Sequence, residues 1–426
     1  EISEVWFDGA KGSGVEQTYY FDQWFALVKE KQPNALIFSD MGPDVRWIGN
    51  EAGYAGEPCW SKIKGDTLTL PHYDTDYLNH GDPYGYDWIM GETNTSLRKG
   101  WFYHDSEDPK SLDKLVDIYF NSIGRNTPLL LNVPPNKQGL ISKEDENRLR
   151  EFNAVIENSF KTDLALNAQA DATNYRGKSL GVETFVPNNV TDGNYDTYWT
   201  TDNGQRTGSL IIDLGQDTLF DIINIQEYIP LGQRIEKFSI EVYNDNLDQW
   251  KQVYEGQTIG YKRLARIAPT TASKIRINIL GSQEIPLINN VGVYKSDPAI
   301  ELEPDVLDGL KVIDDQNVGT GIDQIQYSGT WDDRKSEDGF LNNTTHWTDK
   351  AGSKATLKFK GSKFYFLSAT HPNHGTYEVS IDGGESFIID TYAENGFNLK
   401  QIVYESEELT YGEHTVELTV TGNNPH

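Results

Sequence analysis

The stretch Val5-Trp6-Phe7-Asp8-Gly9-Ala10 is a short apolar run that ends in a carboxylate and a glycine. Such a run is typical of a buried strand, and it would deliver Asp8 to the end of a sheet, where α/β folds usually place their chemistry. Asp-Gly is also ordinary turn chemistry, so an Asp8 that only caps the following loop is the alternative. The neighbouring segments are needed to choose between a catalytic Asp8 and an Asp8 that caps a loop.

The segments that follow alternate between helical and strand-like patterns. Aromatic and apolar residues recur at roughly helical spacing over 15–31, and residues 35–38 then predict a second strand that ends in an acid. The order strand, helix, strand implies parallel pairing through a right-handed crossover. Residues 41–80 are rich in Gly, Pro, Asp and Trp and show no clear period, so we expect them to be largely loop.

Further elements of the same kind extend to about residue 160. Residues 87–92 predict a strand, and helices are expected to begin after Ser111 and after Ser142, the second resembling a capping box. The apolar run 128–133 is typical of a strand buried on both faces of a parallel sheet. About four strands are visible where eight close a (β/α)8 barrel, so the pattern predicts the later half of such a barrel.

From about Leu164, turn residues separate short β-like segments, which predicts two antiparallel β-sandwich domains of the jelly-roll, galactose-binding-like type. The first set of strands is expected over 210–214, 238–242, 274–279 and 291–294. The second set is expected over 355–359, 363–367, 376–381 and 414–420. The predicted domains are the barrel portion 1–162, the first sandwich 163–297, a linker 298–304 and the second sandwich 305–426.

Composition limits the classes of partner. Lys+Arg 37 against Asp+Glu 65 gives a formal net charge of -28, which argues against nucleic acid or an anionic membrane and favours a neutral ligand. The single cysteine, Cys59, excludes an intrachain disulfide and leaves the redox compartment open. No apolar run approaches the ~18 residues of a membrane-spanning helix.

If Asp8 is one catalytic carboxylate, a second should lie at the same end of the barrel, because glycosidic cleavage uses a pair of acids. The stretch Arg46-Trp47-Ile48-Gly49-Asn50-Glu51 sets a cation, an indole and an acid together in the long loop. The alternative is that Arg46 and Glu51 form a surface ion pair, which would contribute little.

Residues 1–162 resemble the later half of the catalytic barrel of α-L-fucosidases, glycoside hydrolase family 29. Trp6-Phe7-Asp8-Gly9 resembles the nucleophile strand of that family, and Leu129-Leu130-Leu131-Asn132-Val133-Pro134-Pro135 resembles its last barrel strand. The segment 46–53 is similar to the acid/base segment of the subfamily that removes α-1,3- and α-1,4-linked fucose.

This resemblance implies a retaining exo-α-L-fucosidase acting on terminal fucose of branched, Lewis-type glycans, with Asp8 as nucleophile and Glu51 as general acid/base. Asp8 should then stay ionised, whereas the loop bearing Trp47 should raise the pKa of Glu51. No cofactor is implied for catalysis. Glu92 and His72 are weaker candidates. The residues expected to contact the sugar are Trp6, Arg46, Trp47 and Trp101, with Arg46 alternatively orienting Asp8.

The family's first barrel strands supply histidines and aromatic residues that grip fucose, and they have no counterpart here. We therefore expect a second polypeptide that carries the N-terminal half of the barrel, or a fragment of a longer enzyme. A half barrel leaves two sheet edges unpaired, so the alternative is a non-catalytic, carbohydrate-binding or adhesin-like protein. The resemblance suggests a bacterial protein that is secreted, periplasmic or at the cell surface.

Residues 163–297 resemble a discoidin-type (F5/8 type C-like) module related to carbohydrate-binding module family 32. The resemblance rests on the stretches 190–193, 197–200 and 210–214. It implies a structural calcium whose oxygen ligands would be Asp192, Asn194 and Thr201. An Asp that merely closes a tight turn is an equal alternative, and Asn290 stands where the family commonly has an acid.

Residues 305–426 fit a galactose-binding-like jelly roll by analogy of fold. The segments 327–331 and 371–375 are expected to be loops of that domain, and Trp199 of the preceding domain is expected to lie in its core. Sugar binding by this last domain is a hypothesis, with a spacer or docking role as its alternative.

Overall fold

The protein is described here by a computed structural model, in which the chain forms two compact units, residues 1–310 and 311–426. The residues that the structure describes are 2–8, 18–39, 41–68, 74–244, 249–300, 312–335, 340, 344–361, 363–394, 396–407, 409 and 412–422.

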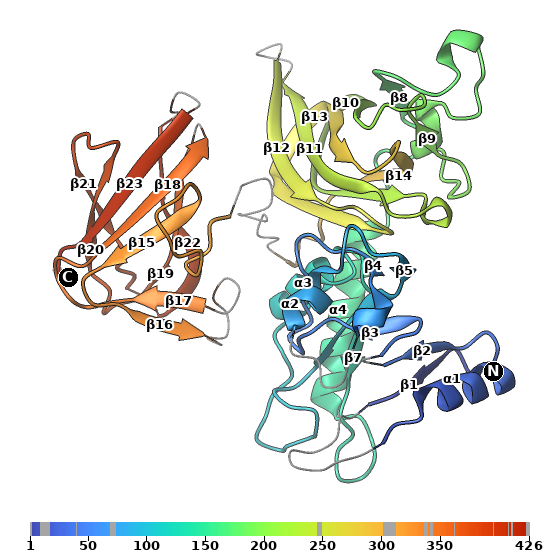
Figure 1. Ribbon diagram of the computed structural model, residues 1–426, viewed down its shortest axis with the longest axis horizontal. Helices are drawn as coiled ribbons and strands as arrows, with labels where there is room; N and C mark the ends of the chain where they lie inside the picture. Colours follow the sequence, from blue (N-terminus) through green and yellow to red (C-terminus); the bar gives the residue numbers. More distant parts are fainter. Residues whose placement is uncertain are drawn as a thin grey trace. The chain divides into compact units, whose positions relative to one another are not determined.

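The first unit opens with a five-stranded parallel sheet that forms a partial barrel (Figure 1). Its strands, in spatial order, are β1 (Glu4–Trp6), β2 (Leu36–Phe38), β3 (Val45–Trp47), β6 (Met90–Ser96) and β7 (Leu129–Asn132). Every pairing in it is parallel, so all five strands end at the same edge of the sheet. The outermost strands are β1 and β7.

Helices connect these strands as the alternating pattern predicts. α1 (Phe21–Lys31) joins β1 to β2, α3 (Leu112–Asn121) joins β6 to β7, and α4 (Lys143–Phe160) follows β7. The predicted N-caps of α3 and α4 are confirmed, because the hydroxyls of Ser111 and Ser142 each accept a hydrogen bond from a first-turn main-chain N–H, at 3.2 Å in both cases. Part of the helix predicted over 15–31 lies outside the described residues.

The prediction for residues 41–80 is wrong in one important respect, because this segment contains the central strand β3. It also contains β4 (Lys62–Ile63), a 3₁₀ turn (Gly65–Thr67) and α2 (Thr75–His80), and β4 pairs antiparallel with β5 (Asp87–Trp88). β3 has three residues and β4 two, which is too short for a period of two to be visible in the sequence. Pairing with neighbouring strands, a tertiary interaction, defines them.

The rest of the first unit is a β-sandwich. Its strands are β8 (Gln169–Ala172), β9 (Trp199–Thr200), β10 (Gly208–Glu227), β11 (Ile235–Asn244), β12 (Gln249–Gln257), β13 (Arg263–Ser282) and β14 (Leu287–Tyr294), with 3₁₀ turns at Lys178–Leu180, Pro187–Val190 and Ile229–Leu231. The predicted strands 210–214 and 274–279 prove to be parts of two 20-residue strands, β10 and β13. Trp199 is fully buried in the core, as predicted.

The long strand β10 changes its pairing partner along its length. β10 pairs with β8 along its first half and with β14 along its second half, and a register shift separates the two parts between Asp213 and Thr218. A shift of this kind bends a strand, so a single chain segment contributes to both layers. The sequence shows it only as an apolar run interrupted by Gly215, Gln216 and Asp217.

The sandwich packs directly on the helices of the partial barrel. Ile222 of β10 and Leu264 of β13 are buried in one cluster with Val116 and Phe120 of α3. Ile300, within the predicted linker 298–304, is buried in the same cluster, so the start of that segment belongs to the first unit. Residues 301–311 lie outside the described residues.

The second unit is an all-β domain with its own core. Its largest sheet has the order β15-β18-β23-β20-β21, and β16–β17 and β19–β22 form two-stranded sheets (Figure 1). The strands are β15 (Gln324–Ser328), β16 (Asp332–Lys335), β17 (Thr344–Trp347), β18 (Lys354–Gly361), β19 (Tyr365–Thr370), β20 (Thr376–Ile381), β21 (Phe387–Asp390), β22 (Asn398–Glu405) and β23 (Gly412–Val420).

Candidate active site

The strand ends of the partial barrel bring the two predicted catalytic carboxylates to one edge. Asp8 follows β1 and is exposed, and Glu51 lies in the loop that follows β3 and is also exposed. Because β1 and β3 run parallel within one sheet, both residues extend from its carboxyl edge. That edge is where barrel enzymes place their reacting groups.

Trp101 is the residue that contacts the Glu51 carboxylate. Its indole Nε1–H donates to Glu51 Oε2 at 2.9 Å, and its main-chain oxygen accepts from Asn132 Nδ2 at 3.0 Å. Asn132 ends β7 and donates also to Ser96 Oγ at 2.9 Å. Trp101 is thus tied to the last two strands of the sheet and reaches from there to the loop of Glu51.

Trp6 and Trp47 extend from the same face of the sheet. In the parallel ladder Trp6 is paired with Phe38 and Trp47 with Glu92, and paired residues point to the same side. Trp6 stacks on Phe38 with ring centroids 4.0 Å apart, and its Nε1–H donates to Glu92 Oε1 at 3.0 Å. Trp47 Nε1–H donates to Asn94 Oδ1 at 3.2 Å.

Glu92 is better placed than the sequence indicated. It lies on β6, is 5% exposed, and faces the same side as Trp6. The pKa of the Glu92 carboxyl is raised to about 7, chiefly by burial; the Trp6 N–H opposes the rise and the neighbouring Glu4 adds to it. Burial also raises the pKa of Glu4. The two acids therefore form a partly desolvated pair beside the indole of Trp6.

The sequence of β6 contains an alternating pattern that indicates this strand. β6 reads Met90-Gly-Glu-Thr-Asn-Thr-Ser96, so Glu92, Asn94 and Ser96 alternate on one face. The alternation is polar, whereas strand prediction relies on apolar alternation. The strand predicted over 87–92 therefore ends at Glu92, whereas β6 continues to Ser96.

Arg46 does not occupy the position expected for a sugar contact. It is on the opposite face of β3 from Trp47, is 0% exposed, and its guanidinium donates to three main-chain oxygens. Nε bonds Leu78 O at 3.0 Å, Nη2 bonds Trp60 O at 2.8 Å, and Nη1 bonds Ile89 O. Arg46 therefore neither contacts the sugar nor orients Asp8; it holds together the segments that surround β3.

The predicted calcium ligands lie in a turn that their own side chains stabilise. Asp192 accepts from the main-chain N–H of Asn194 at 2.7 Å and from the hydroxyl of Thr197 at 2.7 Å, which is an Asx turn. The Thr201 hydroxyl is buried and donates to Gln205 O at 2.5 Å. Within the described residues, no three His, Cys, Asp or Glu side chains are grouped to hold a metal. The turn is thus explained without an ion, and calcium stays a prediction.

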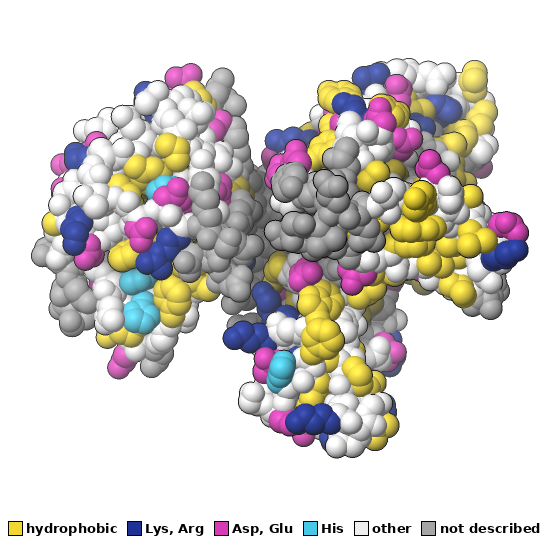
Figure 2. All heavy atoms as spheres, turned by 60° about the horizontal axis from the view of Figure 1, so that its bottom comes forward, with side chains coloured by type: hydrophobic (Ala, Val, Ile, Leu, Met, Phe, Trp, Pro, Cys, Tyr) yellow, Lys and Arg dark blue, Asp and Glu magenta, His cyan; other side chains and the backbone are white. Residues whose placement is uncertain are grey.

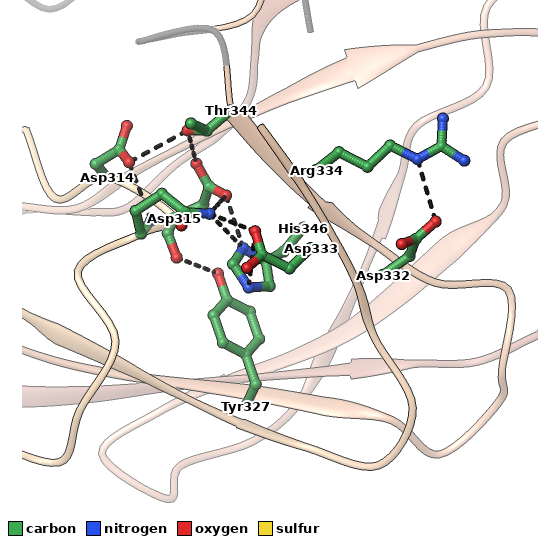
Figure 3. Close-up of polar contacts among 9 residues, drawn as sticks. Asp314, Asp315, Tyr327, Asp332, Asp333, Arg334, Thr344 and His346 are labelled. Atoms are coloured by element: carbon green, nitrogen blue, oxygen red, sulfur yellow. Dashed lines mark hydrogen bonds and ion pairs between the residues drawn. The ribbon is translucent and has the colours of Figure 1, made fainter. Parts of the chain in front are cut away.

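A polar cluster links the strands of the second unit (Figure 3). Asp315 Oδ2 lies 2.7 Å from His346 Nδ1, and the imidazole stacks on Tyr327 with ring centroids 4.2 Å apart. Gln316 donates to Asp333 at 2.8 Å. These side chains bond one another and hold β15 against the β16–β17 hairpin, a structural role. Sugar binding by this unit remains a prediction.

Two further observations concern the surface charge and the helices. On the face shown in Figure 2, basic side chains are interspersed with acidic ones. In the part of the chain that the structure describes, no helix is long and apolar enough to cross a membrane. His72, the weaker candidate, lies outside the described residues.

Two protein families match consecutive parts of this chain. The family described as "Alpha-L-fucosidase" matches residues 3–158, and the family described as "F5/8 type C domain" matches residues 169–291. The first match covers the partial barrel with Asp8, Glu51 and Trp101, and the second covers the sandwich that packs on it.

Two plant proteins named as alpha-L-fucosidases are similar in sequence to this chain. "Putative alpha-L-fucosidase 1" of Oryza sativa subsp. japonica is 45% identical over 294 residues, 69% of this chain and 56% of the relative. "Alpha-L-fucosidase 1" of Arabidopsis thaliana is 41% identical over 296 residues, 69% of this chain and 58% of the relative. The chain therefore spans little more than half the length of these relatives.

A solved structure is similar to this chain. A Ruminococcus gnavus GH29 fucosidase, crystallised in complex with fucose, is 39% identical to this chain. The similarity covers 70% of this chain and 61% of the other, with a TM-score of 0.63.

Proposed function

Residues 3–158 belong to the alpha-L-fucosidase family, glycoside hydrolase family 29, and from this premise we propose that the chain carries the two catalytic carboxylates of a retaining exo-α-L-fucosidase. The proposed substrate is terminal α-1,3- or α-1,4-linked fucose on branched, Lewis-type glycans. The observation that carries the proposal is the Trp101–Glu51 hydrogen bond at the sheet edge from which Asp8 also extends.

The proposed roles follow from the chemistry of glycosidic cleavage. Asp8 attacks the anomeric carbon and forms a covalent fucosyl intermediate, while Glu51 protonates the departing glycosidic oxygen. In the second step Glu51, now a carboxylate, takes a proton from the water that releases fucose. The Trp101 Nε1–H, 2.9 Å from Glu51 Oε2, holds the carboxyl group in one orientation through both steps.

Aromatic side chains are the proposed sugar contacts. Trp6, Trp47 and Trp101 project from the inner face or the carboxyl edge of the sheet, where indole faces suit the apolar C5 methyl group of fucose. We propose these three residues, without Arg46, as the part of the sugar site that this chain contributes.

Further strands are needed to complete the barrel. β1 and β7 are the outermost of five strands, and edge strands present rows of main-chain groups that pair with other strands. A (β/α)8 barrel has eight. We propose that the missing strands come from a preceding segment or from a second polypeptide. Because fucosylated glycans are displayed outside cells, the proposed location is secreted, periplasmic or at the cell surface.

Structural calcium near Asp192 is retained as a proposal for the F5/8 type C domain. If the ion is present, a chelator will lower the thermal midpoint of the first unit and added Ca²⁺ will restore it. An unchanged midpoint would assign the turn to its own hydrogen bonds.

The test of function is hydrolysis of an aryl α-L-fucoside and a Lewis-type trisaccharide by wild type, Asp8→Asn and Glu51→Gln, each assayed as this chain alone and together with the segment or polypeptide that supplies the missing strands. We expect wild type to release fucose from the trisaccharide and each variant to be slower by about a hundredfold or more. Azide should partly rescue Asp8→Gly, because it replaces a missing nucleophile.

Glu30→Gln, which removes an exposed carboxylate from α1, is the matched control and should retain activity. Fucose release that is equal in wild type and in the Asp8 and Glu51 variants would refute the assignment. Correctly folded chain that releases no fucose from either substrate would refute catalysis by this chain alone. It would favour the alternative, a carbohydrate-binding protein with an incomplete barrel.

A further inference from the structure

The loop that carries Glu51 obtains much of its support from the F5/8 type C domain. Residues 48–61 connect β3 to β4 without a helix or strand of their own. The main-chain polar groups of such a loop must find partners elsewhere if they are buried. Several of those partners lie in the sandwich, at positions 160 or more residues later in the chain.

Gln233 is the most specific of these partners. Its amide oxygen accepts from Ser61 N at 2.8 Å, and its amide nitrogen donates to Cys59 O at 2.9 Å. The side chain therefore pairs with residues 59 and 61 as a neighbouring strand would. Gln233 is 2% exposed, so water cannot easily replace either bond. The hydroxyl of Thr258 adds a third bond, accepting from Cys59 N at 2.9 Å.

Charged groups reinforce the same contact. The Glu57 carboxylate accepts from Gln257 N at 2.6 Å and pairs with Arg263, which is 1% exposed. Arg263 in turn donates to the hydroxyl of Tyr254 through Nε and Nη2. A paired and hydrogen-bonded charge in a buried position is held in a single geometry, because moving it would leave a charge unpaired.

A second chain of contacts reaches the loop close to Glu51. Arg266 of β13 contacts Asp117 of α3 at 3.2 Å, and Asp117 accepts from the hydroxyl of Tyr54 at 2.5 Å. Tyr54 O accepts from Asn50 Nδ2 at 2.9 Å, which closes the turn containing Glu51. The sandwich is thus linked through one helix to the residues on either side of Glu51.

The sandwich loops that make these contacts are themselves rigid. Glu227 is 1% exposed and accepts from the main-chain nitrogens of Arg234, Ile235 and Gly260, at 2.7 to 3.0 Å. One carboxylate therefore holds the loop of Gln233 against the loop that begins at Thr258. Both loops belong to the domain and not to the partial barrel.

We infer that the F5/8 type C domain positions the acid/base loop of the catalytic site, and that Gln233 is a positioning residue for Glu51. This inference rests on the proposed function. It gives the domain a role in catalysis that is separate from any ligand of its own. Gln233 acts through the main chain of Cys59 and Ser61 and does not touch substrate.

Two substrates that differ in their leaving group distinguish a positioning role of Gln233 from a general effect on the stability of the protein. Both are assayed with the full chain. The departing sugar needs a proton from Glu51, whereas an activated dinitrophenyl leaving group does not. Gln233→Ala should therefore lower kcat/KM for the trisaccharide by about tenfold, the effect of a misplaced catalytic group. The kcat/KM for the dinitrophenyl fucoside should stay nearly unchanged. Glu51→Gln sets the reference pattern. Asn278→Ala, which removes a hydrogen-bonded amide elsewhere in the sandwich, should not alter the ratio.

Hydrogen exchange gives a second readout that needs no activity. The Ser61 amide, which donates to Gln233 Oε1, should exchange faster in Gln233→Ala than in wild type or Asn278→Ala. Thr258→Val, which replaces with a methyl group the hydroxyl that accepts from Cys59 N, should speed exchange of the Cys59 amide, and Thr258→Ser should keep that amide protected.

The outcomes separate the two proposals. If Glu51→Gln does not impair the trisaccharide selectively, the assignment of Glu51 fails, and hydrogen exchange alone decides whether Gln233 holds the loop. If Glu51→Gln shows the selective loss and Gln233→Ala lowers both substrates equally, the positioning role of Gln233 is refuted. Unchanged exchange of the Ser61 amide in Gln233→Ala and of the Cys59 amide in Thr258→Val would refute the anchoring itself.

Discussion

At the scale of single residues, two acids on this molecule differ because their surroundings differ. Glu51 sits exposed at a loop and receives one indole N–H, whereas Glu92 is buried on β6 beside Glu4 and Trp6. The Arg46 side chain, five positions before Glu51, is enclosed by main-chain oxygens. The residue proposed for catalysis and the structural residue are thus close in sequence but lie in different surroundings, because β3 ends between them.

Glu92 predicts how stability depends on pH. Because the folded state raises the pKa of its carboxyl from 4.5 to about 7, the native state binds this proton more tightly than the unfolded chain does. The stabilisation from protonated Glu92 is fully present below about pH 4.5 and is lost as pH rises through about 7. In wild type the free energy of unfolding should therefore fall between pH 5 and pH 7.5. Glu92→Gln should reduce this fall by about 1 to 2 kcal/mol, measured by denaturant unfolding at the two pH values.

Glu30→Gln is the control, since its carboxylate is exposed on α1 and its loss should leave the slope as in wild type. Some pH dependence should persist in Glu92→Gln, because burial also raises the pKa of Glu227 to about 7. A Glu92→Gln curve that coincides with wild type over this range would contradict the prediction.

At the scale of elements, β10 couples the two parts of the first unit. Ile222 and Ile223 are adjacent and both 0% exposed, but Ile222 packs on α3 and α4 while Ile223 lies in the sandwich core. Each change to Ala should cost roughly 2 to 5 kcal/mol, as is usual for a buried isoleucine. Only Ile222→Ala should increase hydrogen exchange in α3, because only that side chain supports the helix.

The two isoleucine variants control for each other, since they delete the same atoms from opposite faces of one strand. Equal deprotection of α3 in Ile222→Ala and Ile223→Ala would mean that the sandwich and the partial barrel unfold as one cooperative body. In that case hydrogen exchange in α3 would not depend on the face of β10 from which the side chain is removed.

At the scale of the whole molecule, the two compact units bury separate cores. Scanning calorimetry of residues 1–310 should therefore give the same midpoint for the first unit as in the full chain. A fall of more than about 2–4 °C, corresponding to about 1 kcal/mol, would show that the second unit stabilises the first.

Elements whose causes are local could be predicted from the amino-acid sequence. Capping hydroxyls at Ser111 and Ser142 marked the starts of α3 and α4, and the apolar run 129–132 marked β7. The alternation of strands and helices predicted a parallel sheet, and that sheet carries Asp8 and Glu51 at one edge. These features were accessible because hydrophobic period and turn chemistry act over a few residues.

Features that depend on partners far along the chain could not be predicted and became visible in the folded structure. β3 is three residues long and is a strand because β2 and β6 pair with it. Arg46 is structural because Leu78, Ile89 and Trp60 surround it, and Gln233 reaches Cys59 and Ser61 across more than 170 residues. Such bonds leave no period in the sequence, since each requires the folded chain to bring its two ends together.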